Sequence, residues 1–129
     1  MMYHISKRIE GGEFDQVVER ARQALASQGF GVLTEIDVQA TLREKLGEEM
    51  DRYLILGACN PTMAHRAIGA APEIGVLLPC NVVVREDGGD IVVDAMDPVP
   101  VMSVVETPGV HAVAQAVRDL LAKVVDQVA

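Results

Sequence analysis

Two apolar runs joined by a short polar turn constrain the fold of this chain more than any other feature. Residues 74–84 and 91–96 are rich in valine and isoleucine, and Glu86-Asp87-Gly88-Gly89-Asp90 lies between them. Acidic residues and paired glycines at such a position are typical of the tight turn between antiparallel strands. The chain is therefore expected to contain a β-hairpin within a larger sheet.

A long apolar stripe near the C-terminus predicts a helix that packs on this sheet. Thr107-Pro108 has the pattern of an N-cap followed by proline at the first helical position. From there apolar residues recur at helical spacing, namely Val110, Val113, Ala114, Val117, Leu120, Leu121, Val124, Val125 and Val128. Because such a stripe is buried along most of its helix, the helix is expected to lie across the sheet.

Three further segments have strand character. Residues 3–9 and 30–38 partly alternate apolar with polar side chains, which predicts two strands. Residues 53–59 are apolar on both faces and are expected to form a central strand covered on each side by helices, a partner subunit or both. Asp97-Pro98-Val99-Pro100 predicts a loop or a sheet edge, because proline removes a hydrogen-bond donor from a strand.

Helical spacing appears in three segments before the C-terminal stripe. Residues 14–25 are amphipathic and are followed by Gly29, which suits the end of a helix. Residues 41–46 predict a short exposed helix closed by Gly47. Asn60-Pro61 resembles a helix start, and this helix is expected to run to about residue 70.

Together these patterns predict a single α+β domain over residues 1–129. The length suits one domain whose core needs neither disulfides nor metal. A hairpin, further strands and a long C-terminal helix indicate a two-layer sandwich, in which an antiparallel or mixed sheet of about five strands packs against helices.

Charge and composition argue against nucleic acid and membranes as partners. The net charge is −8, and Lys and Arg are scattered, so the chain would repel a phosphate backbone. No apolar run approaches the roughly 18 residues of a membrane-spanning helix, and no signal-peptide pattern is present at the start. A cytoplasmic protein is expected, in which both cysteines stay reduced by default.

Cys59 is the sharpest candidate for chemistry. It ends an apolar run directly before Asn60-Pro61, so its thiol would lie at a helix N-terminus, whose partial positive charge favours thiolate. His65 lies roughly one turn inside that helix and could act as a base. The alternative interpretation is structural: Cys59 is a small buried residue that ends a core strand, and His65 is a solvated helix residue.

Cys80 has a similar sequence setting but a more apolar one. Alternation places it on one strand face with Leu78, Val82 and Val84, which favours burial. A redox pair with Cys59 requires the two Cα atoms to lie within about 7 Å. No Cys-x-x-Cys motif supports such a pair.

Soft metal ligands are a further possibility. Cys59, His65 and Cys80 are candidate metal ligands, and Met63, Met96 and Met102 would join them in a Cu(I) site if they converged in space. In a core with few aromatic residues, the methionines are explained equally well as packing residues. Asp94 and Asp97 are either a carboxylate pair or caps at a strand end.

The candidate ligand-binding set is therefore Cys59, Asn60, His65, Cys80, Met96 and Asp97. The sequence has no phosphate-cradling glycine motif, serine elbow or metalloprotease helix motif, so it assigns no cofactor.

Three segments resemble a known family. They are Gly57-Ala58-Cys59-Asn60-Pro61 with Ala64-His65-Arg66-Ala67, then Pro72-Glu73-Ile74-Gly75-Val76-Leu77-Leu78-Pro79-Cys80-Asn81-Val82-Val83-Val84, and then Met96-Asp97-Pro98. They resemble the small bacterial and archaeal proteins of domain of unknown function 302, over nearly the whole chain. The resemblance implies a compact α+β domain that associates as a homodimer, and it implies no activity.

Three functional hypotheses remain open. The first is a homodimeric binding module that holds a small ligand or a soft metal near Cys59, His65 and Met96. The second is a thiol-based redox enzyme or sensor, with Cys59 as nucleophile, Cys80 as resolving thiol and His65 as base. The third is a structural or regulatory interaction protein with inert cysteines. The first is preferred, because it also accounts for a central strand that is apolar on both faces.

Overall fold

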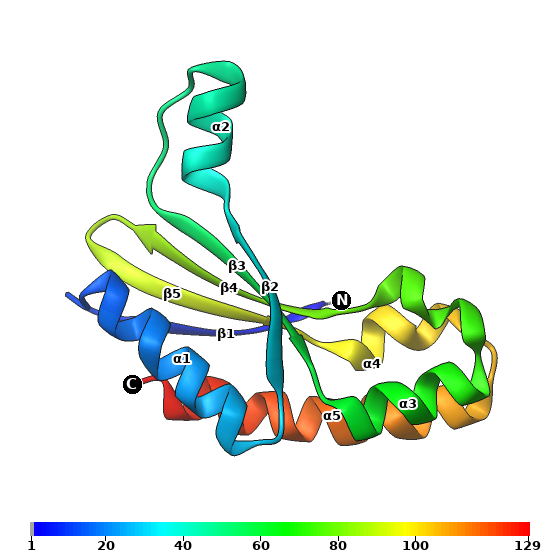
Figure 1. The fold of residues 1–129 in the computed structure, drawn as a ribbon. Helices are drawn as coiled ribbons and strands as arrows, with labels where there is room; N and C mark the ends of the chain where they lie inside the picture. The colour runs from blue at the N-terminus through cyan, green and yellow to red at the C-terminus, as the bar shows by residue number, and fades with distance from the viewer. Residues whose placement is uncertain (1) are drawn as a thin grey trace.

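A five-stranded antiparallel sheet forms the centre of the protein (Figure 1), in a computed structural model that describes residues 2–129. The strands lie in the order β1-β5-β4-β3-β2. Their bounds are β1 His4–Ile9, β2 Gly31–Asp37, β3 Tyr53–Cys59, β4 Cys80–Asp87 and β5 Asp90–Met96. The expected α+β class, antiparallel sheet and long C-terminal helix are confirmed.

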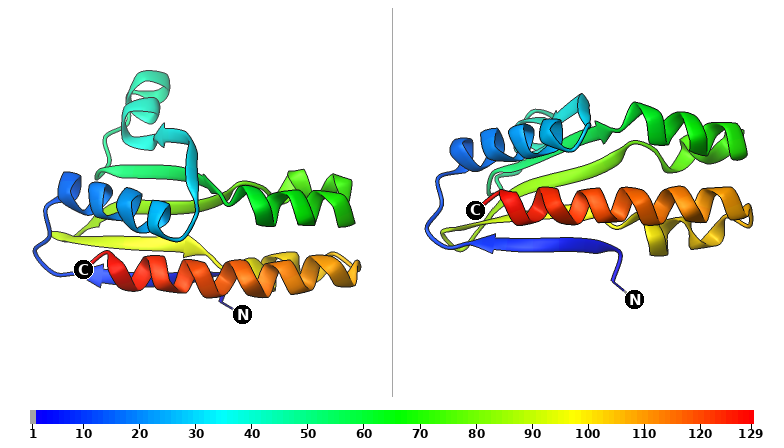
Figure 2. Two further views of the ribbon diagram at one scale, coloured as in Figure 1. Left: turned by 60° about the horizontal axis from the view of Figure 1, so that its bottom comes forward. Right: turned by 90° about the horizontal axis from the view of Figure 1, so that it is seen from below.

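Helices occupy one side of the sheet and extend beyond one end of it. Their bounds are α1 Phe14–Ser27, α2 Val38–Leu46, α3 Pro61–Ala70, α4 Pro98–Val101 and α5 Pro108–Gln127, with short 3-10 helices η1 Pro72–Leu77 and η2 Met102–Val104. The long α5 lies beside α1 over its C-terminal half and beside α3 over its N-terminal half (Figure 2). The molecule is therefore a sheet backed by two helices, with a helical extension at one end.

The main core lies between the sheet and helices α1 and α5. Strand pairing aligns Leu56 with Val82 and Val84 with Val93, and all four side chains are fully buried. On α5, Leu121 meets them with no exposed surface. Burying one such side chain contributes about 1.5–3 kcal/mol, so this face of the sheet supplies most of the driving force for folding.

A second, smaller core stabilises the helical extension. It contains Ala67 of α3, Ile74 of η1, Met102 of η2 and Ala114 of α5. Small alanines let α3 and α5 approach closely, and Val113 contacts both cores. The end of the sheet nearest α3 is thus the junction between two packed clusters.

The opposite face of the sheet is not covered by any element within residues 2–129. Here Ile36, Ile55 and Val83 lie side by side on neighbouring strands, because Ile36 pairs with Ile55 and Ile55 pairs with Val83. Only one face of β3 is therefore covered within the chain. The cover expected for its second face stays a prediction.

Helix α2 projects away from the rest of the molecule (Figure 1). None of its residues is buried. Asp37 caps its start, and Gly47 ends it with φ +68°, as the sequence indicated. The helix begins at Val38, three residues earlier than expected, because the Asp37 side chain accepts a hydrogen bond from the Ala40 N–H.

The turn of the β4-β5 hairpin confirms the sequence interpretation. Gly88 and Gly89 both have positive φ, +59° and +89°, as a two-residue hairpin turn that matches the strand twist requires. The strand expected from residue 74 is wrong over its first part, however. Residues 72–77 form η1, which begins at Pro72, and β4 begins only at Cys80.

The segment after β5 is also different from the expectation. Asp97-Pro98-Val99-Pro100 was expected to be a loop or sheet edge, but Pro98–Val101 is the short helix α4. The Asp97 carboxylate caps it by accepting a hydrogen bond from the Val99 N–H at 3.0 Å. Proline ends the strand as anticipated, but its fixed φ also suits the first turn of a helix.

Candidate functional site

Cys59 and Cys80 line the same apolar pocket at the junction of the two cores. They come from neighbouring antiparallel strands, and Cys80 pairs directly with Ala58, one residue before Cys59. The pocket has a cavity volume of about 30 Å³ and is bounded by α3, α5 and the segments around α4. A cavity of this size holds about one water-sized group.

The start of α3 fixes the position of Cys59. Asn60 is the N-cap, and its side-chain oxygen accepts a hydrogen bond from the Met63 N–H at 3.3 Å. Its amide nitrogen donates to the Gln28 carbonyl at 3.4 Å, which connects this turn to the end of α1. The sequence pattern Cys59-Asn60-Pro61 thus has the local structure that it predicted, with the thiol directly before a helix N-terminus.

The two thiols differ in exposure. Cys59 is partly exposed, whereas Cys80 is buried. Burial, together with a smaller effect of the neighbouring Cys59, raises the pKa of the Cys80 thiol from 9.0 to about 11. Cys80 therefore stays protonated at neutral pH unless a bound group replaces its proton.

Two methionines share the pocket with the thiols. Met63 lies in the first turn of α3 and Met102 begins η2, and both line the cavity. Met102 is 4% exposed, and Met63 is half-buried. Two cysteines, two methionines and Asn60 are therefore among the residues that line one small, mainly apolar cavity.

Three residues of the sequence-predicted set lie elsewhere. His65 is on the exposed side of α3, Met96 lies on the uncovered face of the sheet, and Asp97 is buried beneath α4. The Asp97 carboxylate accepts a hydrogen bond from Arg118 of α5 at 2.9 Å, which explains its burial as a structural ion pair. His65 and Met96 are therefore not among the residues that line the pocket of Cys59.

The uncovered face contains a polar cluster that sequence reasoning missed. Asp94 of β5 accepts hydrogen bonds from Ser6 at 2.6 Å and from Arg85 at 2.8 Å, and His4 lies 3.8 Å away. His4, Arg85, Asp94 and Tyr53 border a groove of about 530 Å³. Asp94 and Asp97 therefore do not form a carboxylate pair, because each has its own arginine.

In the sequence, the only indication of this cluster is the alternation of polar and apolar residues along the strands. Ser6, Arg85 and Asp94 each fall on the polar positions of a strand, but only the register brings them together. The Nδ1 atom of His4 is buried and has no hydrogen-bond partner among residues 2–129. The groove is thus a second place where a partner could contribute a polar group.

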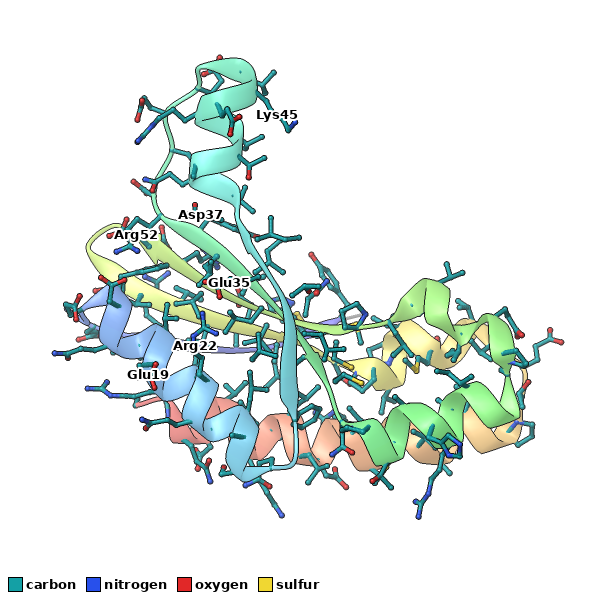
Figure 3. All side chains as sticks on the ribbon, in the orientation of Figure 1. Glu19, Arg22, Glu35, Asp37, Lys45 and Arg52 are labelled. Carbon is teal, nitrogen blue, oxygen red and sulfur yellow. The ribbon has the colours of Figure 1, made fainter. Side chains whose placement is uncertain are left out.

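Ion pairs outside the cysteine-lined pocket and the Asp94 groove link α1 to neighbouring segments at the edge of the sheet. Arg22 of α1 and Glu35 of β2 face one another and form an ion pair (Figure 3). Arg52 pairs with Asp15 at 3.0 Å, and its guanidinium lies 4.0 Å from the centre of the Phe14 ring. These contacts close the core at its edge.

Clusters of His, Cys, Asp and Glu that could hold a metal are absent from the part of the chain described. No group of three or more His, Cys, Asp or Glu side chains among residues 2–129 is placed to hold a metal ion. No helix in this range has both the length and the apolar character to cross a membrane.

The protein is thus a small α+β domain: a five-stranded antiparallel sheet backed by helices, with a helical extension that borders the pocket. Residues 5–128 match the family described as Domain of unknown function DUF302, and the chain belongs to this family. A crystal structure of a conserved DUF302 protein from Bacillus stearothermophilus has 26% sequence identity and a TM-score of 0.93, and the match covers 100% of each chain. The comparison with curated proteins gives no match.

Proposed function

We propose that this protein is a homodimeric binding module that holds a small ligand or a soft metal in the pocket between Cys59 and Cys80. One observation carries the proposal: Cys59 and Cys80, which come from neighbouring strands, are both among the residues that line the same small apolar cavity. Few precisely placed polar or soft groups in an otherwise apolar pocket are typical of small-ligand sites. The ligand position is therefore revised from the set that included His65 and Met96.

The surface for a second copy is the uncovered face of the sheet together with α2. On α2, Val38, Leu42 and Leu46 recur at intervals of four residues and so lie on one side of the helix, yet Leu46 is 68% exposed. The uncovered face carries further exposed apolar side chains, including Ile36, at 47%, and Tyr3.

A second copy of the chain suits this surface better than an unrelated partner. The chain presents both an apolar sheet face and a free amphipathic helix, so a two-fold axis would let each copy cover the other at both places. The unpartnered Nδ1 of His4 would then gain access to polar groups of the second copy. The family resemblance implies the same association.

Native mass spectrometry of protein purified without chelator or air tests both parts of the proposal. The expected result is a dimer with an added mass that is lost from Cys59→Ser. The matched control is His65→Gln, in the same helix but outside the pocket, which should keep the added mass. A bare monomer, or an added mass that survives in Cys59→Ser, would contradict the proposal.

Thiol redox chemistry is the second candidate, favoured by the shared pocket. A peroxide would oxidise the Cys59 thiol to a sulfenic acid with release of water, and Cys80 would displace a second water to form a disulfide. The raised pKa of Cys80 keeps this thiol protonated, so Cys80 would be a slow resolving thiol. The exposed position of His65 leaves it outside the pocket.

Mild alkylation of the folded protein separates the hypotheses. Rapid modification of Cys59, with disulfide formation on peroxide treatment, would support redox chemistry. Two inert thiols and a bare dimer would instead support a structural or regulatory interaction protein.

A further inference from the structure

We infer that the groove on the uncovered face of the sheet is a binding site for a small zwitterion, an α-amino acid with an aromatic or other apolar side chain. In this site the Arg85 guanidinium binds the carboxylate of the ligand, and the Asp94 carboxylate binds its ammonium group. The groove is separate from the pocket of Cys59 and Cys80, and its lining comes from one chain. The inference therefore goes beyond the proposed function.

Strand register places the charged and apolar parts of the groove on the same face of the sheet. Tyr53 of β3 pairs with Arg85 of β4, and Val83 of β4 pairs with Asp94 of β5. Directly paired residues of antiparallel strands have their side chains on the same face, as do residues two apart along one strand. Met96 follows Asp94 by two residues, so it belongs to this face as well. All five residues line the groove.

The two charged groups of the groove are fixed in position but can still bind a ligand. Arg85 Nε donates to Asp94 Oδ2 at 2.8 Å, and Ser6 Oγ donates to Asp94 Oδ1 at 2.6 Å. Within residues 2–129, Arg85 makes no other side-chain hydrogen bond or ion pair. Its Nη atoms therefore remain available as donors, and each carboxylate oxygen of Asp94 can accept a further hydrogen bond.

The charges of the lining favour a zwitterion over a simple anion or cation. Arg85 and Asp94 are its charged residues, one of each sign, in a chain of net charge −8. A lone anion would be repelled by Asp94 and by the chain as a whole, and a lone cation would be repelled by Arg85. The carboxylate and ammonium groups of an α-amino acid are bonded to one carbon. This short separation suits two protein groups that are themselves in hydrogen-bond contact.

The remaining lining suits an apolar side chain on the ligand. Val83, Met96, Tyr3 and Tyr53 contribute apolar and aromatic surface beside the charged pair. The groove volume of about 530 Å³ lies within the range of roughly 300–1,000 Å³ that is usual for small-molecule sites. An aromatic ring on the ligand would add contacts with the tyrosine rings. An amphipathic amino acid therefore matches both parts of the groove.

The groove would lie at the subunit interface of the proposed dimer. A second copy on the uncovered face would lie above the groove, and the ligand would occupy the space between the two subunits. Because one chain supplies both Arg85 and Asp94, the charged contacts to the ligand do not require the second copy. Binding is therefore expected whether or not the dimer forms.

Isothermal titration calorimetry with three related probes tests the charge requirement. The probes are L-phenylalanine, 3-phenylpropionate, which lacks the ammonium group, and 2-phenylethylamine, which lacks the carboxylate. We expect L-phenylalanine to bind one-to-one at neutral pH and each of the other probes to bind at least about tenfold more weakly, because each loses one charged hydrogen-bonded contact. No binding of L-phenylalanine, or equal affinity for either of the other probes, would overturn the inference.

Two arginine variants make a matched comparison. Arg85→Gln should weaken the binding of L-phenylalanine at least about tenfold. Arg8→Gln removes the same charge from an arginine that pairs with Asp90 and does not line the groove, so it should bind like the wild type. Equal affinities in the two variants would overturn the site. Thermal unfolding verifies that both variants fold, and the probe comparison on the wild type tests the site without them.

Asp94→Asn tests the second contact separately. This variant should lose the preference for L-phenylalanine over 3-phenylpropionate, because the ammonium group no longer meets a carboxylate. An unchanged preference would contradict the assigned role of Asp94.

The outcomes distinguish this inference from the proposed function. If L-phenylalanine binds through Arg85 while native mass spectra show a bare monomer, the groove site stands and the proposed function fails. If the spectra show a dimer with an added mass that depends on Cys59 while L-phenylalanine does not bind, the proposed function stands and the groove site fails.

Discussion

The two faces of the sheet are built from the same strands but have opposite chemistry. On the face toward α1 and α5, Leu56 and Val82 are fully buried. On the other face, Ile55 and Val83 are only half-buried, and Val83 pairs with Asp94 of the polar cluster. Each strand thus contributes alternate residues to a finished core and to a surface that lacks its cover.

The two faces therefore have different roles in this account: the covered face stabilises the fold, and the uncovered face is the proposed surface for association. The covered face accounts for the stability of a single chain, and its end carries the thiol pocket. The uncovered face combines apolar side chains with fixed ion pairs, a mixture typical of the surfaces through which subunits associate. The following predictions test the contrast between the faces, beginning with the largest effect.

Adjacent residues of β3 provide the sharpest comparison. Leu56→Ala leaves a cavity in the core and should lower the free energy of unfolding by about 3 kcal/mol. Ile55→Ala, on the uncovered face, should cost less than about 1 kcal/mol at concentrations where the dimer dissociates. Urea unfolding measures both. Equal losses would show that the faces do not differ as described.

Cys80 tests the covered face through pH. Its thiol has a pKa of about 11 in the folded protein, so the unfolded chain, with a pKa near 9.0, releases its proton first as the pH rises. The free energy of unfolding should therefore be unaffected by this group below about pH 8 and fall by up to about 2–3 kcal/mol between pH 9 and 11. Subtracting the profile of Cys80→Ala isolates the effect. A flat difference would mean that the thiol is well solvated.

Gly57 tests how tightly the uncovered face is packed near the pocket. A Cβ added here would lie 2.1 Å from Thr34 Oγ1 and 3.0 Å from Pro79 Cγ. Gly57→Ala should therefore lower stability by about 1–2 kcal/mol, the usual cost of overpacking. Adding Thr34→Ala should restore most of the loss, which thermal unfolding of the single and double variants would measure. Failure of this rescue would place the strain at Pro79.

Local patterns predicted most of the secondary structure because their causes are local. The Gly88-Gly89 turn, the Asn60 cap and the stripe of α5 each depend on residues near in sequence, and each was found where expected. The strand predicted for residues 74–77 was wrong, because an apolar run beside prolines suits a short helix as well as a strand. Cys80 was correctly expected to be buried.

The candidate site was only partly predictable because it depends on tertiary packing. Met63 faces the cavity, and His65 is rotated by about 200° around the same helix, which places it outside. Met96 alternates with the buried Ala95 and so lies on the other face of the sheet. Which residues line the pocket thus depends on helix rotation and strand register, which a single sequence does not reveal.

Sedimentation velocity over a concentration series tests the contrast between the faces most directly. The wild type should sediment as a dimer, and Ile36→Asp, on the uncovered face, should raise the dimer dissociation constant by more than about tenfold. The control is Val76→Asp on η1, which is 86% exposed but lies away from this face, and it should remain dimeric. A monomeric wild type, or a dimer that survives in Ile36→Asp but dissociates in Val76→Asp, would contradict the account.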